Sequence, residues 1–294
     1  MDFGLASVVP QRVASPEEAR TVVAAAGAAI LTGLPDQDAA IGAGRAMLGK
    51  DCLRIGLQFE ATKDKQEMEA AVVAEQPADE RGRKRRFTAT AERMVPHNDG
   101  FGFGDFGPDH LFLWCGRPDP DGGDSFLVDG LKLLDLLAAD PEYRDLAEFC
   151  WSVDIDQSEP NFPLAAHAPI ARRLPSGTRS GSTGSGSTGS GSRAQVRHHP
   201  FQAPVPGADE DTQQPFITRW SEAVTAARDS GPMFRVAAGE MICVDNYRLT
   251  HGRDGYTDPN RVMLSIWGWS TDAIAVPEGP LDIVRPVAPK AMAR

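Results

Sequence analysis

Two short segments that lie far apart in the chain contain residues able to bind a metal ion. His97 and Asp99 lie within residues 96–100, and His251 lies within residues 244–253. Residues two apart on an extended strand point to the same face, so we expect His97 and Asp99 to lie side by side. Two imidazoles and one carboxylate form the facial triad that holds ferrous iron and leaves coordination positions open. The pattern predicts a metal centre at which another molecule and dioxygen bind directly, although an isolated His-x-Asp pair is weak evidence.

An arginine and a serine follow these residues at positions that favour binding of an organic acid. Arg261 comes ten residues after His251 (261 − 251) and opens a strongly apolar run, so we expect it to reach the same cavity. Ser125 comes 26 residues after Asp99 (125 − 99) and places a hydroxyl on a neighbouring strand. A guanidinium binds a carboxylate through two parallel hydrogen bonds. A dicarboxylate is therefore predicted to bind the metal at one end and Arg261 and Ser125 at the other.

Other residues near the two segments have alternative interpretations. Asn98, Phe101 and Phe103 flank the metal-binding pair and either shape a substrate pocket or pack in the interior. Arg248 either reaches the pocket or bridges to Asp245. The sequence leaves both alternatives open.

Two further pairs of residues are assigned to simpler roles. His198 and His199 are adjacent beside a predicted hairpin edge, and we expect them to face solvent. Trp267 and Trp269 alternate along the last apolar strand, and we expect both to lie in the core.

The elements that must position these residues follow from local patterns. Ser15, Pro16 and Glu18 form a helix start with a capping box, and the Ala/Val-rich run continues that helix to about Ala28. Further helices are expected over residues 36–48, 131–137 and 215–228. Strands are expected over residues 29–35, 111–115, 125–128, 240–244 and 262–269.

Residues 180–192 contain only Ser, Gly and Thr and repeat the sequence GSTGSG. Such a segment has no apolar group to offset the entropy of ordering it, so it is expected to be a flexible linker. Its regularity indicates an engineered replacement of a native loop. The flanks at residues 168–173 and 194–199 could pair as a hairpin across it. We therefore expect one domain over residues 1–294.

Composition bounds the class of protein. The 294 residues are 41% hydrophobic and 24% charged, with a net charge of −11 and four cysteines. This charge argues against a nucleic-acid partner, and no apolar run is long enough to span a membrane. The first residues lack the features of a secretory signal, so the cytoplasm is the expected location. Residues 81–86 contain five positive charges. This run is either a solvated loop or a basic lip that attracts an anionic substrate.

Taken together, these motifs resemble one known family. His97 and Asp99, then Gly-Gly-Asp-Ser ending at Ser125, then Asn-x-Arg-x-x-His-Gly-Arg containing His251, then Arg261, are similar to the TauD/TfdA-type (clavaminate synthase-like) iron(II)- and 2-oxoglutarate-dependent dioxygenases. The resemblance implies an α+β fold with a mainly β core, a double-stranded β-helix (jelly roll) with flanking helices. It also implies that His97, Asp99 and His251 bind iron, and that Arg261 and Ser125 bind 2-oxoglutarate. Arg253 is the alternative to Arg261.

The family's chemistry couples oxidation of an unactivated C–H bond by dioxygen to conversion of 2-oxoglutarate into succinate and carbon dioxide. Related halogenases lack a carboxylate at the position of Asp99, so hydroxylation is expected here. The expected substrate is a small polar metabolite, amino-acid-like or nucleotide-like and possibly anionic, with Asn98, Phe101, Arg248 and Arg253 as candidate contacts. Two alternatives remain: a cupin-like zinc or manganese hydrolase or isomerase, and a non-catalytic binding module. The sequence predicts no oligomeric state.

Overall fold

The structure is a computed structural model, and it describes residues 1–57, 91–159, 164–174, 193–208, 210–258, 260–279 and 292. The basic run at residues 81–86 and the Ser/Gly/Thr segment at residues 180–192 lie outside the described residues. The expectations for these two segments therefore stay predictions.

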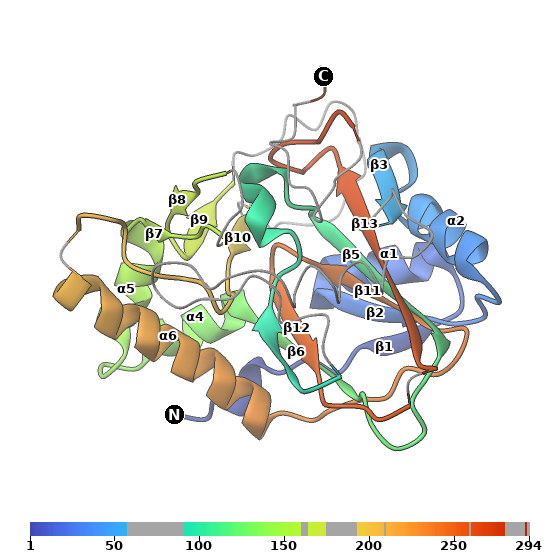
Figure 1. The fold of residues 1–294 in the computed structure, drawn as a ribbon, viewed down its shortest axis with the longest axis horizontal. Coiled ribbons are helices and arrows are strands. Elements are labelled where there is room, and N and C mark those ends of the chain that lie inside the picture. Colours follow the sequence, from blue (N-terminus) through green and yellow to red (C-terminus); the bar gives the residue numbers. More distant parts are fainter. Residues whose placement is uncertain are drawn as a thin grey trace, which may run out of the picture.

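Two β-sheets form the centre of the molecule (Figure 1). The larger has the strand order β1-β2-β11-β5-β13-β3, and the smaller has the order β4-β12-β6. The bounds of the larger sheet's strands are β1 (Gln11–Val13), β2 (Ala28–Leu31), β11 (Met241–Asp245), β5 (His110–Arg117), β13 (Val262–Ser270) and β3 (Cys52–Leu57). Those of the smaller are β4 (Met94–His97), β12 (Leu249–Arg253) and β6 (Ser125–Asp129).

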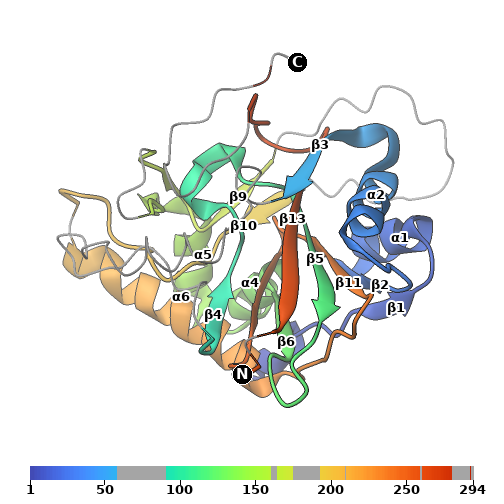
Figure 2. The same cartoon turned by 45° about the vertical axis from the view of Figure 1, so that its right-hand side comes forward.

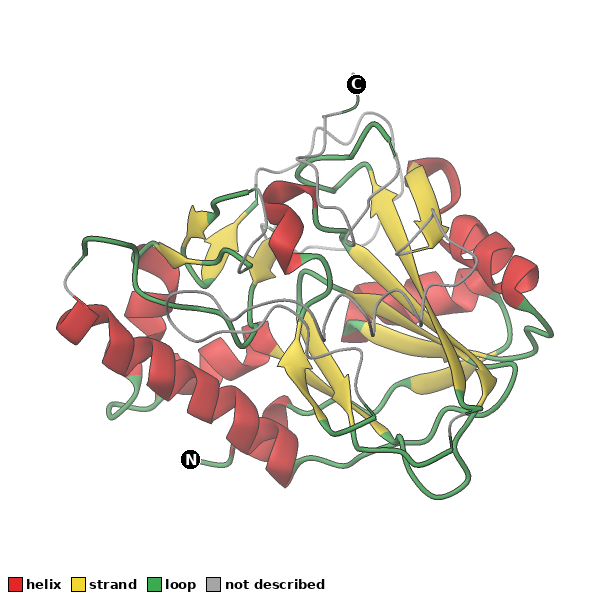
Figure 3. Cartoon of the chain, in the orientation of Figure 1, coloured by secondary structure: helices red, strands yellow, loops and turns green. Residues whose placement is uncertain are grey.

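Helices cover the outer faces of both sheets (Figures 1 and 3). On the larger sheet lie α1 (Pro16–Ala26) and α2 (Gln37–Leu48). Beside the smaller sheet lie α4 (Gly130–Ala139), α5 (Arg144–Ser152) and α6 (Glu210–Ser230). Short 3-10 helices are η1 (Phe3–Ala6), η2 (Gly49–Asp51) and η3 (Phe101–Phe106). Figure 2 shows the same arrangement from a second direction.

Three buried clusters hold the layers together. The inner cluster joins residues of the larger sheet, such as Leu111 and Val244, to Leu127 and Leu249 of the smaller sheet. The second lies between α1, α2 and the larger sheet, and the third lies among α4, α5, α6 and the outer face of the smaller sheet. Burial of apolar surface is the main stabilising contribution to folding, so these clusters fix the two sheets relative to each other. The mixed α and β class with a β core is confirmed.

Local signals predicted several elements well. Ser15 caps α1, its hydroxyl accepts a hydrogen bond from the Glu18 N–H, and Glu18 completes the capping box. That helix ends at Gly27, whose φ of 84° lies in the left-handed region that glycine adopts without strain. Asp36 caps α2 in the same way, through the Ala39 N–H.

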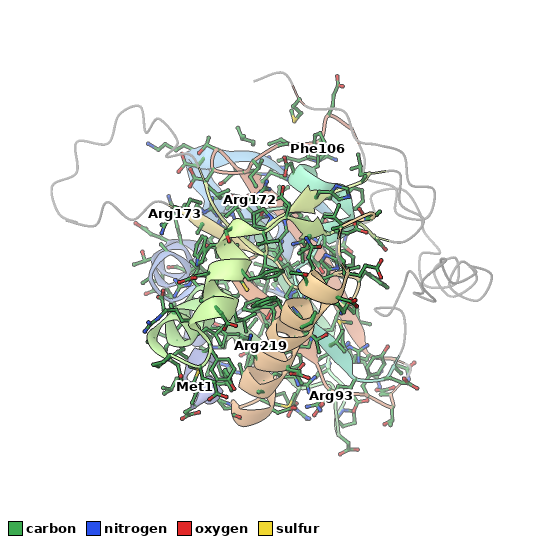
Figure 4. All side chains as sticks on the ribbon, turned by 90° about the vertical axis from the view of Figure 1, so that its left-hand side faces the viewer. Met1, Arg93, Phe106, Arg172, Arg173 and Arg219 are labelled. Carbon is green, nitrogen blue, oxygen red and sulfur yellow. The ribbon has the colours of Figure 1, made fainter. Side chains whose placement is uncertain are left out.

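The expected hairpin across residues 180–192 is confirmed in its described part. The strands β9 (Ala171–Arg173) and β10 (Ala194–Val196) pair antiparallel, with Ala171 opposite Val196. A second small pair consists of β7 (Ile155–Asp156) and β8 (His167–Ala168). Arg172 and Arg173 mark this end of the molecule in Figure 4, and Arg219 marks α6 on the face turned toward the viewer.

The expectation that His198 and His199 face solvent is wrong. Both are buried, with exposed fractions of 3% and 1%. The His198 N–H donates to the Asn98 side chain, and the His198 carbonyl accepts from the Asn98 N–H. His199 stacks on Phe101, with ring centroids 4.3 Å apart. The segment after β10 is therefore covered by the chain around η3 and does not form an open edge.

In the described ranges, no helix combines the length and apolar character that crossing a bilayer would require.

Candidate metal centre

His97, Asp99 and His251 converge on one point of the inner face of the smaller sheet. His97 on β4 lies directly opposite His251 on the antiparallel strand β12. One ligand atom from each of the three residues lies within 4.8 Å of the other two. The Asp99 Oδ1 atom is 3.4 Å from the His97 Nε2 atom and 3.5 Å from the His251 Nε2 atom. The sequence prediction of these three residues as one cluster is confirmed.

The strand pairing explains why the two imidazoles face each other. Directly opposite residues on antiparallel strands project to the same side of a sheet. The register shifts between His251 and Arg253, because Arg253 lies opposite Met94. The extra residue falls within β4, next to Pro96, and bulges of this kind re-aim side chains close to functional sites. Asp99 follows the end of β4 and completes the cluster.

The carboxylate of Asp99 is held in one orientation by the larger sheet. Its Oδ2 atom accepts a hydrogen bond from the Trp267 indole N–H at 2.8 Å and another from the Ser265 hydroxyl at 3.0 Å. Its Oδ1 atom faces the two histidines. One oxygen is thus available to a metal ion while the other is fixed by the protein, an arrangement that tunes metal ligands.

Two buried amides fasten the backbone around Asp99. The Asn246 side chain accepts from the Asp99 N–H at 2.9 Å and donates to the carbonyl oxygens of Asp99 and Pro108. The Asn98 side chain donates to the carbonyl oxygens of Asn246 and Leu249. Both N–H donors of Asn98 are used in this way and its oxygen accepts from His198. The structure therefore gives Asn98 a positioning role, and its role as a substrate contact stays a prediction.

The protonation states of the cluster suit a metal ion. Burial raises the pKa of Asp99, but its hydrogen bond with His97 and the nearby His251 outweigh this and hold the pKa below its usual range. Burial, with the neighbouring His97, lowers the pKa of His251 to about 3. The His97 Nδ1 atom lies 2.9 Å from the Val95 carbonyl oxygen, which leaves its Nε2 atom facing the cluster. A carboxylate and unprotonated imidazole are the forms that bind metals, so these residues fit iron.

A small cavity lined by residues of β5, β6 and β13 contains the predicted 2-oxoglutarate-binding residues. Ser125 and Arg261 both line it, together with Cys115, Arg235 and Met263. Ser125 lies two residues along β6 from Leu127, which pairs with His251. Met263 lies two residues along β13 from Ser265, which bonds to Asp99. The cavity therefore lies two residues along each of these strands from a residue that pairs with His251 or bonds to Asp99.

Two polar groups in this cavity have no hydrogen-bond partner among the described residues, whereas Asp119, Asp124 and Arg235 are all bonded. In the part of the chain that the structure describes, the Arg261 guanidinium forms no hydrogen bond or ion pair, and the Ser125 hydroxyl forms no hydrogen bond. Burial lowers the pKa of Arg261, and an arginine guanidinium stays protonated in proteins. A guanidinium and a hydroxyl that share a cavity and lack hydrogen-bond partners are suited to bind a carboxylate.

The other candidate contacts lie elsewhere or have other partners. Arg253 donates to the carbonyl oxygens of Glu92 and Asp254, which argues against it as the alternative to Arg261. Arg248 neither reaches the cluster nor pairs with Asp245, because its guanidinium donates to the Asp129 carboxylate at 2.6 and 2.9 Å. That expectation is corrected: Arg248 ties β12 to the start of α4. Phe101 lies beside Asp99 in a second cavity.

Sequence reasoning missed three residues that position Asp99. Trp267 was correctly placed in the core, with 1% exposure, but its indole N–H also holds the carboxylate. Ser265 lies two residues before it and therefore projects to the same face. Asn246 stood inside the Asn-x-Arg-x-x-His-Gly-Arg motif without an assigned role. A polar residue alternating with tryptophan on an inner strand was the available signal.

Comparisons with known proteins agree with this geometry. The model of the taurine catabolism dioxygenase TauD, TfdA family matches residues 2–267. A comparison with curated proteins found no match.

Several solved structures have a similar fold. An asparagine oxygenase (AsnO) is 18% identical with a TM-score of 0.56, and the match covers 87% of this chain and 77% of that one. AAD-2, in complex with Mn(II) and N-oxalylglycine, is 11% identical with a TM-score of 0.57, over 91% of this chain and 100% of that one. PvcB from Pseudomonas aeruginosa is 13% identical with a TM-score of 0.51, over 86% and 79% of the two chains.

At these identities the solved structures support the fold, whereas the family model spans nearly the whole sequence. With His97, Asp99 and His251 meeting at one point, the chain belongs to the TauD, TfdA family of iron- and 2-oxoglutarate-dependent dioxygenases.

Proposed function

We propose that this protein hydroxylates an unactivated C–H bond of a small amino-acid-like metabolite, with Arg261 and Ser125 binding the distal carboxylate of 2-oxoglutarate. The observation that carries this proposal is that the Arg261 guanidinium and the Ser125 hydroxyl line one cavity and have no hydrogen-bond partner among the described residues. The cavity lies two residues along β6 and β13 from Leu127, which pairs with His251, and from Ser265, which bonds to Asp99. Arg261 is partly buried and its guanidinium has no hydrogen-bond partner among the described residues, so an anionic ligand would supply the interaction that water provides only in part.

Each residue has a defined task in the proposed reaction. His97, Asp99 and His251 would hold the iron. When bound, iron supplies the oxidation of the substrate by dioxygen, coupled to conversion of 2-oxoglutarate into succinate and carbon dioxide. Arg261 and Ser125 orient 2-oxoglutarate along the axis that runs from the cavity to the metal centre. A charge-assisted hydrogen bond to Arg261 contributes about 1.5–3 kcal/mol to this binding.

The carboxylate of Asp99 supports hydroxylation over halogenation. Its Oδ2 atom is bound by Trp267 and Ser265, and its Oδ1 atom faces the histidines, so the position is filled by a protein ligand.

We propose a double-stranded β-helix for the two central sheets and one domain for the whole chain. The pairing of β9 with β10 supports the single domain.

The proposed substrate class is supported by the ligand of a protein with a similar fold. One similar structure is the asparagine oxygenase in complex with Fe(II), 3-hydroxyasparagine and succinate. An anionic, amino-acid-like substrate taken from the cytoplasm is our proposal for this chain.

The test is succinate formation by purified protein supplied with iron(II), ascorbate, 2-oxoglutarate and a panel of amino acids and nucleotides. Succinate should rise above the uncoupled rate when the substrate is present, and the product should gain one oxygen atom. His251→Ala should remove both signals. A protein that turns over its substrate with zinc or manganese and without 2-oxoglutarate would be a hydrolase or isomerase, and the proposal would be abandoned.

A further inference from the structure

We infer that Tyr256 is a positioning residue that fixes the guanidinium of Arg261 at the depth where the distal carboxylate of 2-oxoglutarate binds. The inference rests on the proposed function, and it adds a residue with no place in the metal centre. Tyr256 lies in the loop between β12 and β13.

Two arginines lie over the ring of Tyr256. The Arg261 guanidinium carbon lies 4.8 Å from the ring centroid, and the Arg253 guanidinium carbon lies 4.6 Å from it. A cation over the face of an aromatic ring within about 6 Å is attracted by the ring quadrupole. The ring therefore attracts both guanidiniums.

Hydrogen bonds to the backbone hold Arg253 and Tyr256 in place. We call Arg253, Tyr256 and Arg261 the arginine–tyrosine stack. The Arg253 Nη1 atom donates to the Glu92 carbonyl oxygen at 2.6 Å and to the Asp254 carbonyl oxygen at 3.0 Å. The Tyr256 N–H donates to the Ala91 carbonyl oxygen at 2.9 Å. The position of Tyr256 is thus fixed by its own backbone bond and by its contact with Arg253. The Arg261 guanidinium, in contrast, has no hydrogen bond within the described residues.

Arg261 also packs closely against a glycine. Gly123 has a φ of 73°, and a Cβ atom built there would lie 2.9 Å from the Arg261 Nε atom. The Arg261 side chain is therefore in contact with an aromatic ring and with a backbone position that strongly disfavours a side chain. This restricts the rotamers of a long side chain before a ligand binds, and such preorganisation raises affinity.

A buried carboxylate holds the loop that contains Tyr256. Asp119 is 1% exposed and accepts hydrogen bonds from the Thr257 N–H at 2.7 Å and the Asp258 N–H at 2.6 Å. The Arg261 N–H donates to the Asp258 carbonyl oxygen at 3.1 Å. Asp119, which follows β5, therefore fixes the residues that connect Tyr256 to Arg261.

The ring should matter only for ligands that reach Arg261. The matched pair of ligands is 2-oxoglutarate and 2-oxopentanoate, which has the same chain length and no distal carboxylate. The matched pair of variants is Tyr256→Leu, which removes the ring, and Tyr256→Phe, which keeps it. The Tyr256 hydroxyl forms no hydrogen bond within the described residues, so Tyr256→Phe is a conservative control.

The experiment is calorimetric binding of each ligand to the full-length protein loaded with Mn(II), with thermal unfolding as the check on folding. Tyr256→Leu should weaken 2-oxoglutarate binding by roughly 3- to 30-fold, the range expected for loss of a cation–π contact. It should leave 2-oxopentanoate binding unchanged, and Tyr256→Phe should bind both ligands as the unaltered protein does. Tyr256→Met provides a second non-aromatic variant if Tyr256→Leu does not fold.

The possible failures point to different ideas. Equal 2-oxoglutarate binding by the unaltered protein and Arg261→Met would overturn the proposed role of Arg261, and with it this inference. Loss of binding in Arg261→Met with no change in the folded Tyr256→Leu or Tyr256→Met would overturn the inference alone. An equal loss for both ligands would show a general structural role and would also overturn it.

Discussion

Replacing Trp267 by Phe should weaken metal binding without altering any metal ligand. The Trp267 indole N–H donates to the Asp99 Oδ2 atom at 2.8 Å, and the side chain is 1% exposed. A hydrogen bond to a charged group contributes about 1.5–3 kcal/mol. After the substitution, Ser265 is the described side chain that still donates to this oxygen, at 3.0 Å. Asp99 then loses much of the restraint on its orientation.

The expected loss of metal affinity follows from the role of such partners. Removing a group that orients a metal ligand typically weakens metal binding 10- to 100-fold, which corresponds to about 1.4–2.8 kcal/mol. Trp269→Phe is the matched control, because Trp269 lies on the same strand, is 2% exposed and donates its indole N–H to the Phe106 carbonyl oxygen at 3.0 Å. Both variants lose the same atoms from the core.

The assay is an anaerobic titration with Fe(II) or Mn(II) against a competing chelator, with unfolding free energies measured on the metal-free proteins. Both variants should lose stability, by about 1–3 kcal/mol, and only Trp267→Phe should lose metal affinity. If Trp269→Phe lost as much metal affinity as Trp267→Phe, the effect would come from core packing. The argument that Trp267 orients Asp99 would then be refuted.

Three further outcomes are expected. Asn98→Ala should lower the free energy of unfolding by about 1–3 kcal/mol in urea titrations, because it leaves buried carbonyl and N–H groups without partners; an unchanged midpoint would contradict this role. Arg248→Ala should cost stability in the same assay, because it leaves the buried Asp129 carboxylate unpaired, while the KM for 2-oxoglutarate stays constant; a raised KM would restore Arg248 as a pocket residue. Burial raises the pKa of Asp109, but its charged neighbours and hydrogen bonds have the larger effect and lower the pKa below its usual value. The ionised Asp109 carboxylate therefore stabilises the folded protein fully above about pH 4, and this stabilisation decreases as the pH falls. Asp109→Asn should therefore show a flatter loss of stability between pH 7 and 3, and parallel curves would count against the assignment.

The metal centre was accessible from the sequence because its signals are short-range within each segment. The spacing of His97 and Asp99 and the residues around His251 are local patterns, and strand periodicity gives them a direction. Their meeting across 154 residues (251 − 97) followed from resemblance to a family, since no local rule specifies which strands become neighbours. The capping box of α1 was equally accessible, because all its partners lie within four residues.

The failures share a different cause: each concerned a hydrogen bond between distant segments. His198 was expected to face solvent because a hairpin edge in isolation is exposed, but Asn98, a hundred residues away, bonds to its backbone. Arg248 was compared with Asp245, its neighbour in sequence, whereas its partner Asp129 is 119 residues away. The hydrophobic pattern placed Trp267 correctly in the core, but it contains no information on where an indole N–H points.

The edge position of β4 gives the metal ion a consequence for folding. β4 pairs with β12 on one side and carries His97, while Asp99 follows immediately after it. A slip of one residue along β12 would turn His97 to the opposite side of the sheet and separate it from His251. A bound ion would therefore crosslink β4 to β12 and stabilise only the register in which His97 lies opposite His251. Loss of the ion would remove this restraint on the register of β4.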